Sequence, residues 1–136
     1  MAVIRLDVAN MINQYINGLQ PFGPSKIGIL GETDSIALMQ MPGGNEVPFF
    51  DGSRMKGVNF NIMAKNEDPS VAPEFLSYLF QELELLQALP SANGSYDFYG
   101  IDITSLPSLV AMDNYGFAIY QCSITVNILI HKGVGL

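Results

Sequence analysis

The strictest alternation in the chain runs from about Gly116 to His131. Apolar side chains at every second position face one way, namely Tyr120, Cys122, Ile124, Val126, Ile128 and Ile130. Gln121, Ser123, Thr125 and Asn127 lie at positions between them. This period of two predicts a strand with one buried and one wet face, which at ~3.4 Å per residue spans roughly 50 Å. Strands usually have ~5 to 6 residues, so we expect part of this one to extend beyond the body of the domain.

Hydrophobic periodicity predicts two helices and five further strands. Apolar residues recur at three- and four-residue steps over residues 2–17, and again in a helix that begins between Ser70 and Pro73 and runs to Leu89 before Pro90. Shorter runs predict strands at Lys26–Gly31, Ser35–Met41, Gly57–Lys65, Tyr96–Thr104 and Leu106–Asp113, the first two as a hairpin. Because strands and helices form separate blocks, we expect a single α+β domain over residues 1–136. Its sheet would be mostly antiparallel, with two α-helices packed on one face.

The segment from Pro42 to Arg54 is rich in proline and glycine, which interrupt regular structure. We expect an extended loop at 42–54 or a frayed hairpin tip. The segment nevertheless contains Val47, Phe49 and Phe50. A large apolar side chain left in water forgoes ~1.5 to 3 kcal/mol relative to a buried one, so a partner surface would stabilise this segment.

Charge is distributed unevenly along the chain. The 6 Lys and Arg against 13 Asp and Glu give a net charge of −7, which disfavours binding to nucleic acids and anionic lipid headgroups. Five bases balance five acids over residues 1–65, whereas residues 66–131 contain eight acids and no Lys or Arg. Copies could therefore associate head to tail, with bases against acids. Charged residues make up 14% of the chain, below the ~25% of an average domain, so some apolar surface is expected to meet a partner.

The chain offers few groups for catalysis. The single histidine, His131, follows the last predicted strand and is expected to be solvated. The single cysteine, Cys122, lies on the apolar face of that strand, where an inert core thiol is expected. Glu82 and Glu84 point in different directions on a helix, and the glycines match neither dinucleotide-binding nor phosphate-loop spacing. We therefore expect a protein that is not an enzyme, with no catalytic residue, metal site or cofactor.

Targeting signals are also not expected. Polar residues interrupt the apolar positions near the start of the chain, which argues against a secretory signal peptide. The purely apolar runs are only a few residues long, against the ~20 residues that a spanning helix needs. The expectation is synthesis in the cytoplasm and no membrane partner.

Four features in a fixed order give the chain a family resemblance. They are the N-terminal helix, the Phe-Asp-Gly-Ser-Arg sequence at Phe50–Arg54 before the strand Lys56–Lys65, the helix to Leu89, and Pro107 with the Asn114-Tyr115-Gly116 turn before the last strand. Together they resemble the minor capsid proteins of tailed bacteriophages. Those proteins are similar to tail terminators, small α+β proteins that form a sixfold ring at the head-proximal end of a long tail.

The resemblance implies a structural protein of the virion neck or tail, made in the cytoplasm of the bacterial host. It implies a hexameric ring that terminates the tail tube, with the tail tube protein and the head-completion or connector protein as partners. DNA would pass through without specific binding, and an acidic or neutral bore suits this because it does not bind phosphate. The alternative is a small-molecule or peptide-binding module, in which loop 42–54 closes over an apolar pocket containing Phe49, Met39 and Met41.

We expect the subunit interface in and beside the 42–54 segment. Val47, Phe49 and Phe50 would supply apolar anchors, and Arg54 and Lys56 would face carboxylates of the adjacent copy. A contact of this kind is heterologous and closes into a ring when its rotation permits. The segment would be mobile in a monomer and ordered in the ring.

Overall fold

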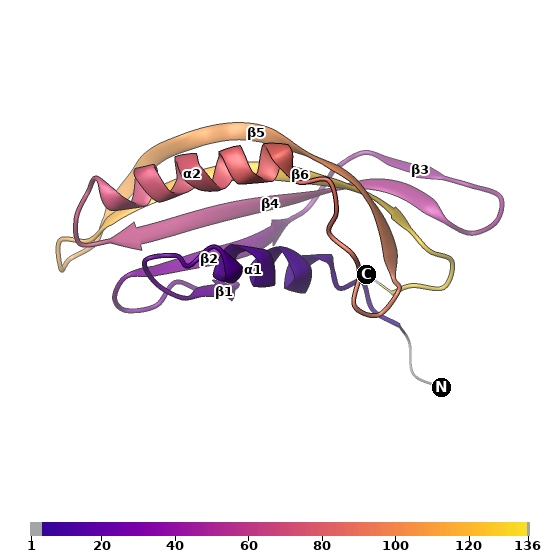
Figure 1. Ribbon diagram of the computed structural model, residues 1–136, viewed down its shortest axis with the longest axis horizontal. Helices are drawn as coiled ribbons and strands as arrows, with labels where there is room; N and C mark the ends of the chain where they lie inside the picture. Colours follow the sequence, from indigo (N-terminus) through magenta and orange to yellow (C-terminus); the bar gives the residue numbers. More distant parts are fainter. Residues whose placement is uncertain (1–3, 136) are drawn as a thin grey trace.

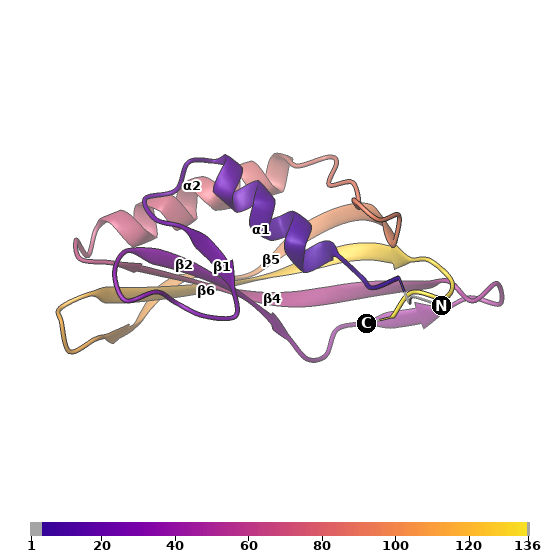
Figure 2. The same ribbon diagram turned by 90° about the horizontal axis from the view of Figure 1, so that it is seen from below.

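Two helices cover one face of a six-stranded sheet in the computed structural model, which describes residues 4–135 (Figures 1 and 2). The helices are α1 (Val8–Gly18) and α2 (Val71–Leu85). The strands are β1 (Ser25–Ile27), β2 (Ser35–Met41), β3 (Glu46–Pro48), β4 (Arg54–Asn66), β5 (Tyr96–Met112) and β6 (Ala118–Ile130). Their order is β1-β2-β4-β6-β5, with β3 beside the first residues of β4, and every pair except β1 with β2 is antiparallel. The predicted α+β class is confirmed.

The three long strands β4, β6 and β5 form the centre of the structure. β6 pairs with β4 from Ala118 to Ile130 without interruption, and with β5 on its other side. The apolar positions of β6 face the helices and are fully buried from Cys122 through Ile130. The predicted alternation is therefore confirmed. The opposite face, which neither helix covers (Figure 2), carries polar side chains at its centre and some apolar ones, such as Met63 and Leu129.

The first helix begins later than the periodicity predicts. Residues 2 and 3 lie outside the described part of the chain, and residues 4–7 are not helical. Leu6 N–H donates to the carbonyl of Gly135 and Gly135 N–H donates to that of Ile4, each at 2.8 Å. This pairing with the C-terminal segment holds the chain extended up to Asp7, so Ile4 stays exposed and the helix starts at Val8.

The second helix ends at Leu85, four residues before the predicted end. Leu86 adopts extended backbone angles, and residues 86–90 leave the helix. Leu89 is nevertheless buried, because the extended segment carries it into the core, where the Tyr96 hydroxyl donates to its carbonyl at 2.7 Å. Proline at position 90 restricts the preceding backbone but does not decide where the helix stops.

The predicted hairpin of the first two strands is wrong, since β1 and β2 run parallel. The direction of β1 is set by α1. Asn17 donates to the Ser25 carbonyl and accepts from its N–H, at 3.0 and 2.9 Å, and Ser25 Oγ donates to Asn13 at 2.7 Å. Sequence periodicity assigns both asparagines to a solvent face, whereas they fix the start of β1 beside the helix.

Two strands predicted around Pro107 are a single strand, β5. The ladder with β6 shifts register between Ser105 and Ser108, so the proline is accommodated at an irregularity. β5 is also an edge strand, where proline is tolerated better than in a central strand.

The 42–54 segment is more regular than predicted, since it contains the short strand β3 paired with β4. Gly44 permits this return of the chain. A Cβ at Gly44 would overlap the carbonyl oxygen of Gly57, and the backbone φ is +95°. Gly57 N–H also donates to the Asn45 carbonyl at 2.9 Å. The glycines that argued against regular structure are what let the hairpin cross its partner strand this closely.

Truncating the core side of α2 should lower the free energy of unfolding. Leu79 and Leu83 are 0% and 1% exposed, so Leu79→Ala or Leu83→Ala should each cost roughly 2 to 5 kcal/mol. Leu85, 75% exposed on the same helix, is the matched control, and Leu85→Ala should change stability by under about 0.5 kcal/mol. Urea denaturation measures all three, and equal small effects would show that the buried face is wrongly assigned.

Candidate functional site

The residues predicted for a subunit interface gather on one hairpin. Phe50 is fully exposed at the tip between β3 and β4, and Val47 and Phe49 are about half-exposed beside it. The hairpin projects beyond the helices at one end of the molecule (Figure 1). The predicted apolar anchors are therefore brought together on a protruding element. Whether they contact another copy stays a prediction.

The hairpin tip is a defined turn. Phe49 N–H donates to the Ser53 carbonyl at 2.9 Å, and Gly52 N–H donates to the Phe49 carbonyl at 3.1 Å. Asp51 accepts from both the N–H and the hydroxyl of Ser53. Gly52 has a φ of +92°, and a Cβ there would meet the Lys132 side chain at 2.8 Å. The tip thus lies against the segment that follows β6, which fixes the backbone of the turn beside Phe50.

Arg54 differs from the other predicted interface residues because it is engaged within its own chain. Its Nε lies 3.3 Å from a carboxylate oxygen of Glu46, and a terminal nitrogen donates to the Val134 carbonyl at 3.4 Å. Lys56 lies opposite Glu46 in the β3–β4 register and is half-buried. In the single chain the Arg54 guanidinium holds the base of the hairpin.

A second exposed apolar cluster lies at the far end of the β5–β6 hairpin. Its large side chains are each about half-exposed or more, namely Leu106, Leu109, Val110, Met112 and Tyr115. Sequence reasoning missed this cluster, although the expected overhang of the last strand pointed to it. The sequence pattern instead places these residues in a separate short strand, Leu106–Asp113, and in the turn after it.

The same end of the molecule contains a hollow of about 630 Å³. It lies between the turn before β2 and the β5–β6 turn, and its lining includes Leu30, Glu32, Asp113, Tyr115 and Phe117. Apolar and aromatic side chains therefore share this hollow with carboxylates.

Lys65 lies beneath this hollow and is buried, although it is on the polar face of its strand. The side chain is buried, with Nζ 2.8 Å from Asp113 Oδ2 and 5.1 Å from the centre of the Phe117 ring. Nζ also donates to the Gly31 carbonyl at 3.3 Å. The hydrogen bond from Lys65 lowers the pKa of Asp113. These contacts hold the two turns around the hollow in place.

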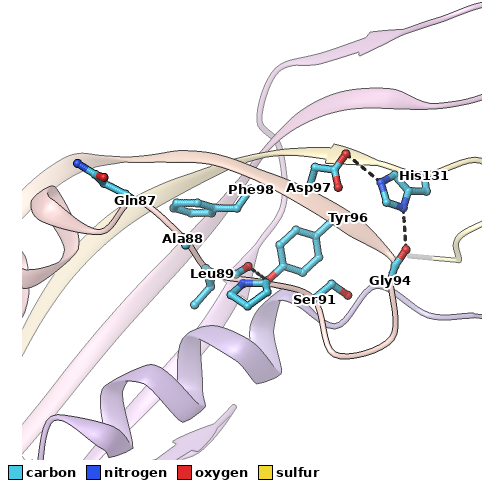
Figure 3. Close-up of a pocket in the computed structure, with 10 residues that line it drawn as sticks. Gln87, Ala88, Leu89, Ser91, Gly94, Tyr96, Asp97, Phe98 and His131 are labelled. Carbon is cyan, nitrogen blue, oxygen red and sulfur yellow. Dashed lines mark hydrogen bonds and ion pairs between the residues drawn. The ribbon is translucent and has the colours of Figure 1, made fainter.

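A separate depression at the opposite end contains the single histidine (Figure 3). His131 Nδ1 lies 2.6 Å from the Gly94 carbonyl and Nε2 lies 3.1 Å from Asp97 Oδ2. Both partners are acceptors, so the protonated imidazole donates to each of them. The hydrogen bonds to Asp97 and Gly94 raise the pKa of His131. With both nitrogens engaged, this imidazole has no free nitrogen to activate the hydroxyl of Ser91, which lines the same depression.

Ser91 itself belongs to a structural network around a buried carboxylate. Asp7 accepts hydrogen bonds from the hydroxyls of Ser91 and Ser95, and from the N–H groups of Ala92 and Asn93. Burial acts to raise the pKa of Asp7, but these four hydrogen bonds lower it overall. The network ties the start of α1 to the loop before β5.

Cys122 lies where the sequence pattern predicts it, in the core. Cys122 is fully buried on the core face of β6, and burial raises the pKa of its thiol to about 12. A thiol of this kind is neutral near neutral pH and is a poor nucleophile. The expectation of a core cysteine is confirmed.

The alternative of an apolar pocket under loop 42–54 gains no support. The hollow beside that segment, about 330 Å³, is lined by polar side chains including Asn59, Asp102, Thr125 and Asn127. Met39 and Met41 do not line it. The apolar side chains of the segment point into solvent at the hairpin tip.

Comparison with known proteins leaves the site to be judged by its geometry. No family model matches the chain, and no curated protein matches it. Within residues 4–135, no three His, Cys, Asp or Glu side chains are grouped so that they could hold a metal ion. Neither described helix is long and apolar enough to cross a membrane.

The His131 pair predicts a pH dependence of stability. Because the pKa of His131 is raised above 6.5, its contribution is complete below about pH 6.5 and is lost as the pH rises through the raised pKa. The melting temperature of the protein should therefore fall more between about pH 6 and pH 8 than that of His131→Ala. The variant should assemble as the unmodified chain does, and loss of assembly with an intact fold would contradict a purely structural histidine.

Proposed function

We propose that this chain is a structural protein of a tailed-phage virion that assembles into a ring in the neck or tail. The observation that carries the proposal is the pair of exposed apolar hairpin ends at opposite ends of the long axis (Figure 1). Exposed apolar clusters mark interaction surfaces in many proteins. Surfaces at opposite ends engage two different neighbours, which is the arrangement that a cyclic assembly needs.

The fold supports the same proposal. An α+β domain with both helices on one face of a mostly antiparallel sheet is what the resemblance to tail terminators implies. In that role the ring, a hexamer, would stop polymerisation of the tail tube and join it to the head connector. Its partners are its own copies, the tail tube protein and the head-completion or connector protein, and its role is structural rather than enzymatic.

The uncovered face of the sheet suits a protein near the path of DNA. Its central positions carry amides and hydroxyls that bond to one another, as Thr125 does with Asn59 at 2.7 Å and Asn127 with Asp102 at 2.9 Å. Of the two lysines on this face, Lys65 is buried and paired with Asp113, and Lys26 is exposed on the edge strand β1. The centre of this face offers phosphates no free lysine or arginine, and the exposed Lys26 lies at its edge, so DNA would pass without specific binding.

Assembly of the purified protein tests the proposal. Sedimentation velocity should show an oligomer, and negative-stain electron microscopy should show closed rings with a central opening. The matched comparison is the same protein diluted stepwise, since a ring held by heterologous contacts dissociates by mass action. A monomer at every concentration, with a small molecule or peptide bound, would favour the binding module instead.

A phage that encodes this chain provides the second test. Without the chain, the lysate should contain DNA-filled heads separate from tails, and tails of irregular length. Supplying the chain in trans should restore joined particles. Normal particles in its absence would contradict a role in the neck or tail.

A further inference from the structure

The two ends of the molecule differ in charge. The end with the hollow carries six acids and two bases, namely Glu32, Asp34, Glu67, Asp68, Glu74 and Asp113 against Lys26 and Lys65. The end with the β3–β4 hairpin carries equal numbers, namely Arg5, Arg54, Lys56 and Lys132 against Asp7, Glu46, Asp51 and Asp97. Two hollow ends would repel each other, whereas a hairpin end meets a hollow end without that repulsion.

The hairpin tip presents a protruding aromatic side chain. Phe50 is fully exposed at the turn, and the turn's backbone hydrogen bonds and the Lys132 side chain against Gly52 hold it. Asp51, next to Phe50, accepts hydrogen bonds from Ser53 that lower its pKa, and nearby Lys132 lowers it further. An aromatic side chain presented on a fixed turn loses little conformational freedom when it is buried by a partner.

The hollow at the other end is large enough for an aromatic side chain and has aromatic residues in its lining. Its volume of about 630 Å³ accommodates an aromatic ring, and Tyr115 and Phe117 offer faces and edges for aromatic contacts. Tyr115 is 85% exposed, so the hollow lacks a cover in the single chain.

The geometry points to the hollow as the seat for the β3–β4 tip of a second copy, with Phe50 inserted against Tyr115 and Phe117. The two surfaces lie at opposite ends of the longest axis, so a chain does not reach its own hollow (Figures 1 and 2). The contact is therefore intermolecular and heterologous, and each copy uses both surfaces once. This inference rests on the proposed self-assembly and names the two surfaces that carry it.

Complementary variants test the contact. Phe50→Asp removes the tip and leaves the hollow, whereas Tyr115→Asp disables the hollow and leaves the tip. Each variant alone should self-associate at least about tenfold more weakly than the unmodified chain, equivalent to ~1.4 kcal/mol. In an equimolar mixture the tip of the Tyr115 variant should enter the hollow of the Phe50 variant, which gives dimers and nothing larger by sedimentation.

The controls separate the possible failures. Tyr99→Asp changes another aromatic residue of β5, 61% exposed, and should assemble as the unmodified chain does. Circular dichroism should show the same fold for all variants, and Phe50→Leu should restore most of the assembly. If the unmodified chain assembles and Phe50→Asp assembles equally well, the proposed contact between Phe50 and the hollow is wrong, but the proposed ring is not contradicted. If the mixture forms no dimers, the proposed contact is also wrong. If the unmodified chain never assembles, the proposed ring is wrong.

Discussion

The register of β6 between β4 and β5 is the constraint on which the rest of this structure depends. Every second side chain from Cys122 to Ile130 is fully buried, and the positions between them are polar except Leu129. A slip of one residue would expose all five buried side chains, at ~1.5 to 3 kcal/mol each. That total approaches the whole stability of a small domain, roughly 5 to 15 kcal/mol, so the register and the face on which the helices pack are fixed together.

The length of this ladder also produces the protruding ends. β4 and β6 have 13 residues each and β5 has 17, whereas the longer helix has 15 residues, which at ~1.5 Å per residue covers less length than the strands do. The hairpins beyond the helices therefore carry apolar side chains with no layer above them. The apolar surface that the low charged fraction suggested is found at these ends, in two clusters.

Several polar residues join parts of the chain that are far apart in sequence. Asp7 binds the loop at 91–95, Lys65 binds Asp113, and Asn17 directs β1. No periodicity marks these residues, because their partners are set by which turns the ladder brings together. The same reason explains the wrong hairpin for β1 and β2 and the burial of Lys65 on the polar face of β4.

The sequence by itself determined the α+β class, the buried face of β6, the stripe of α2 and the inert Cys122. Each depends on a local period or on the apolar character of its own neighbours, which a single chain displays directly. Only the tertiary structure decided the parallel pairing of β1, the end of α2 at Leu85, and the hollow beside Tyr115. These depend on contacts between distant segments, whose free energy is absent from any local pattern and appears only when the long strands bring those segments together.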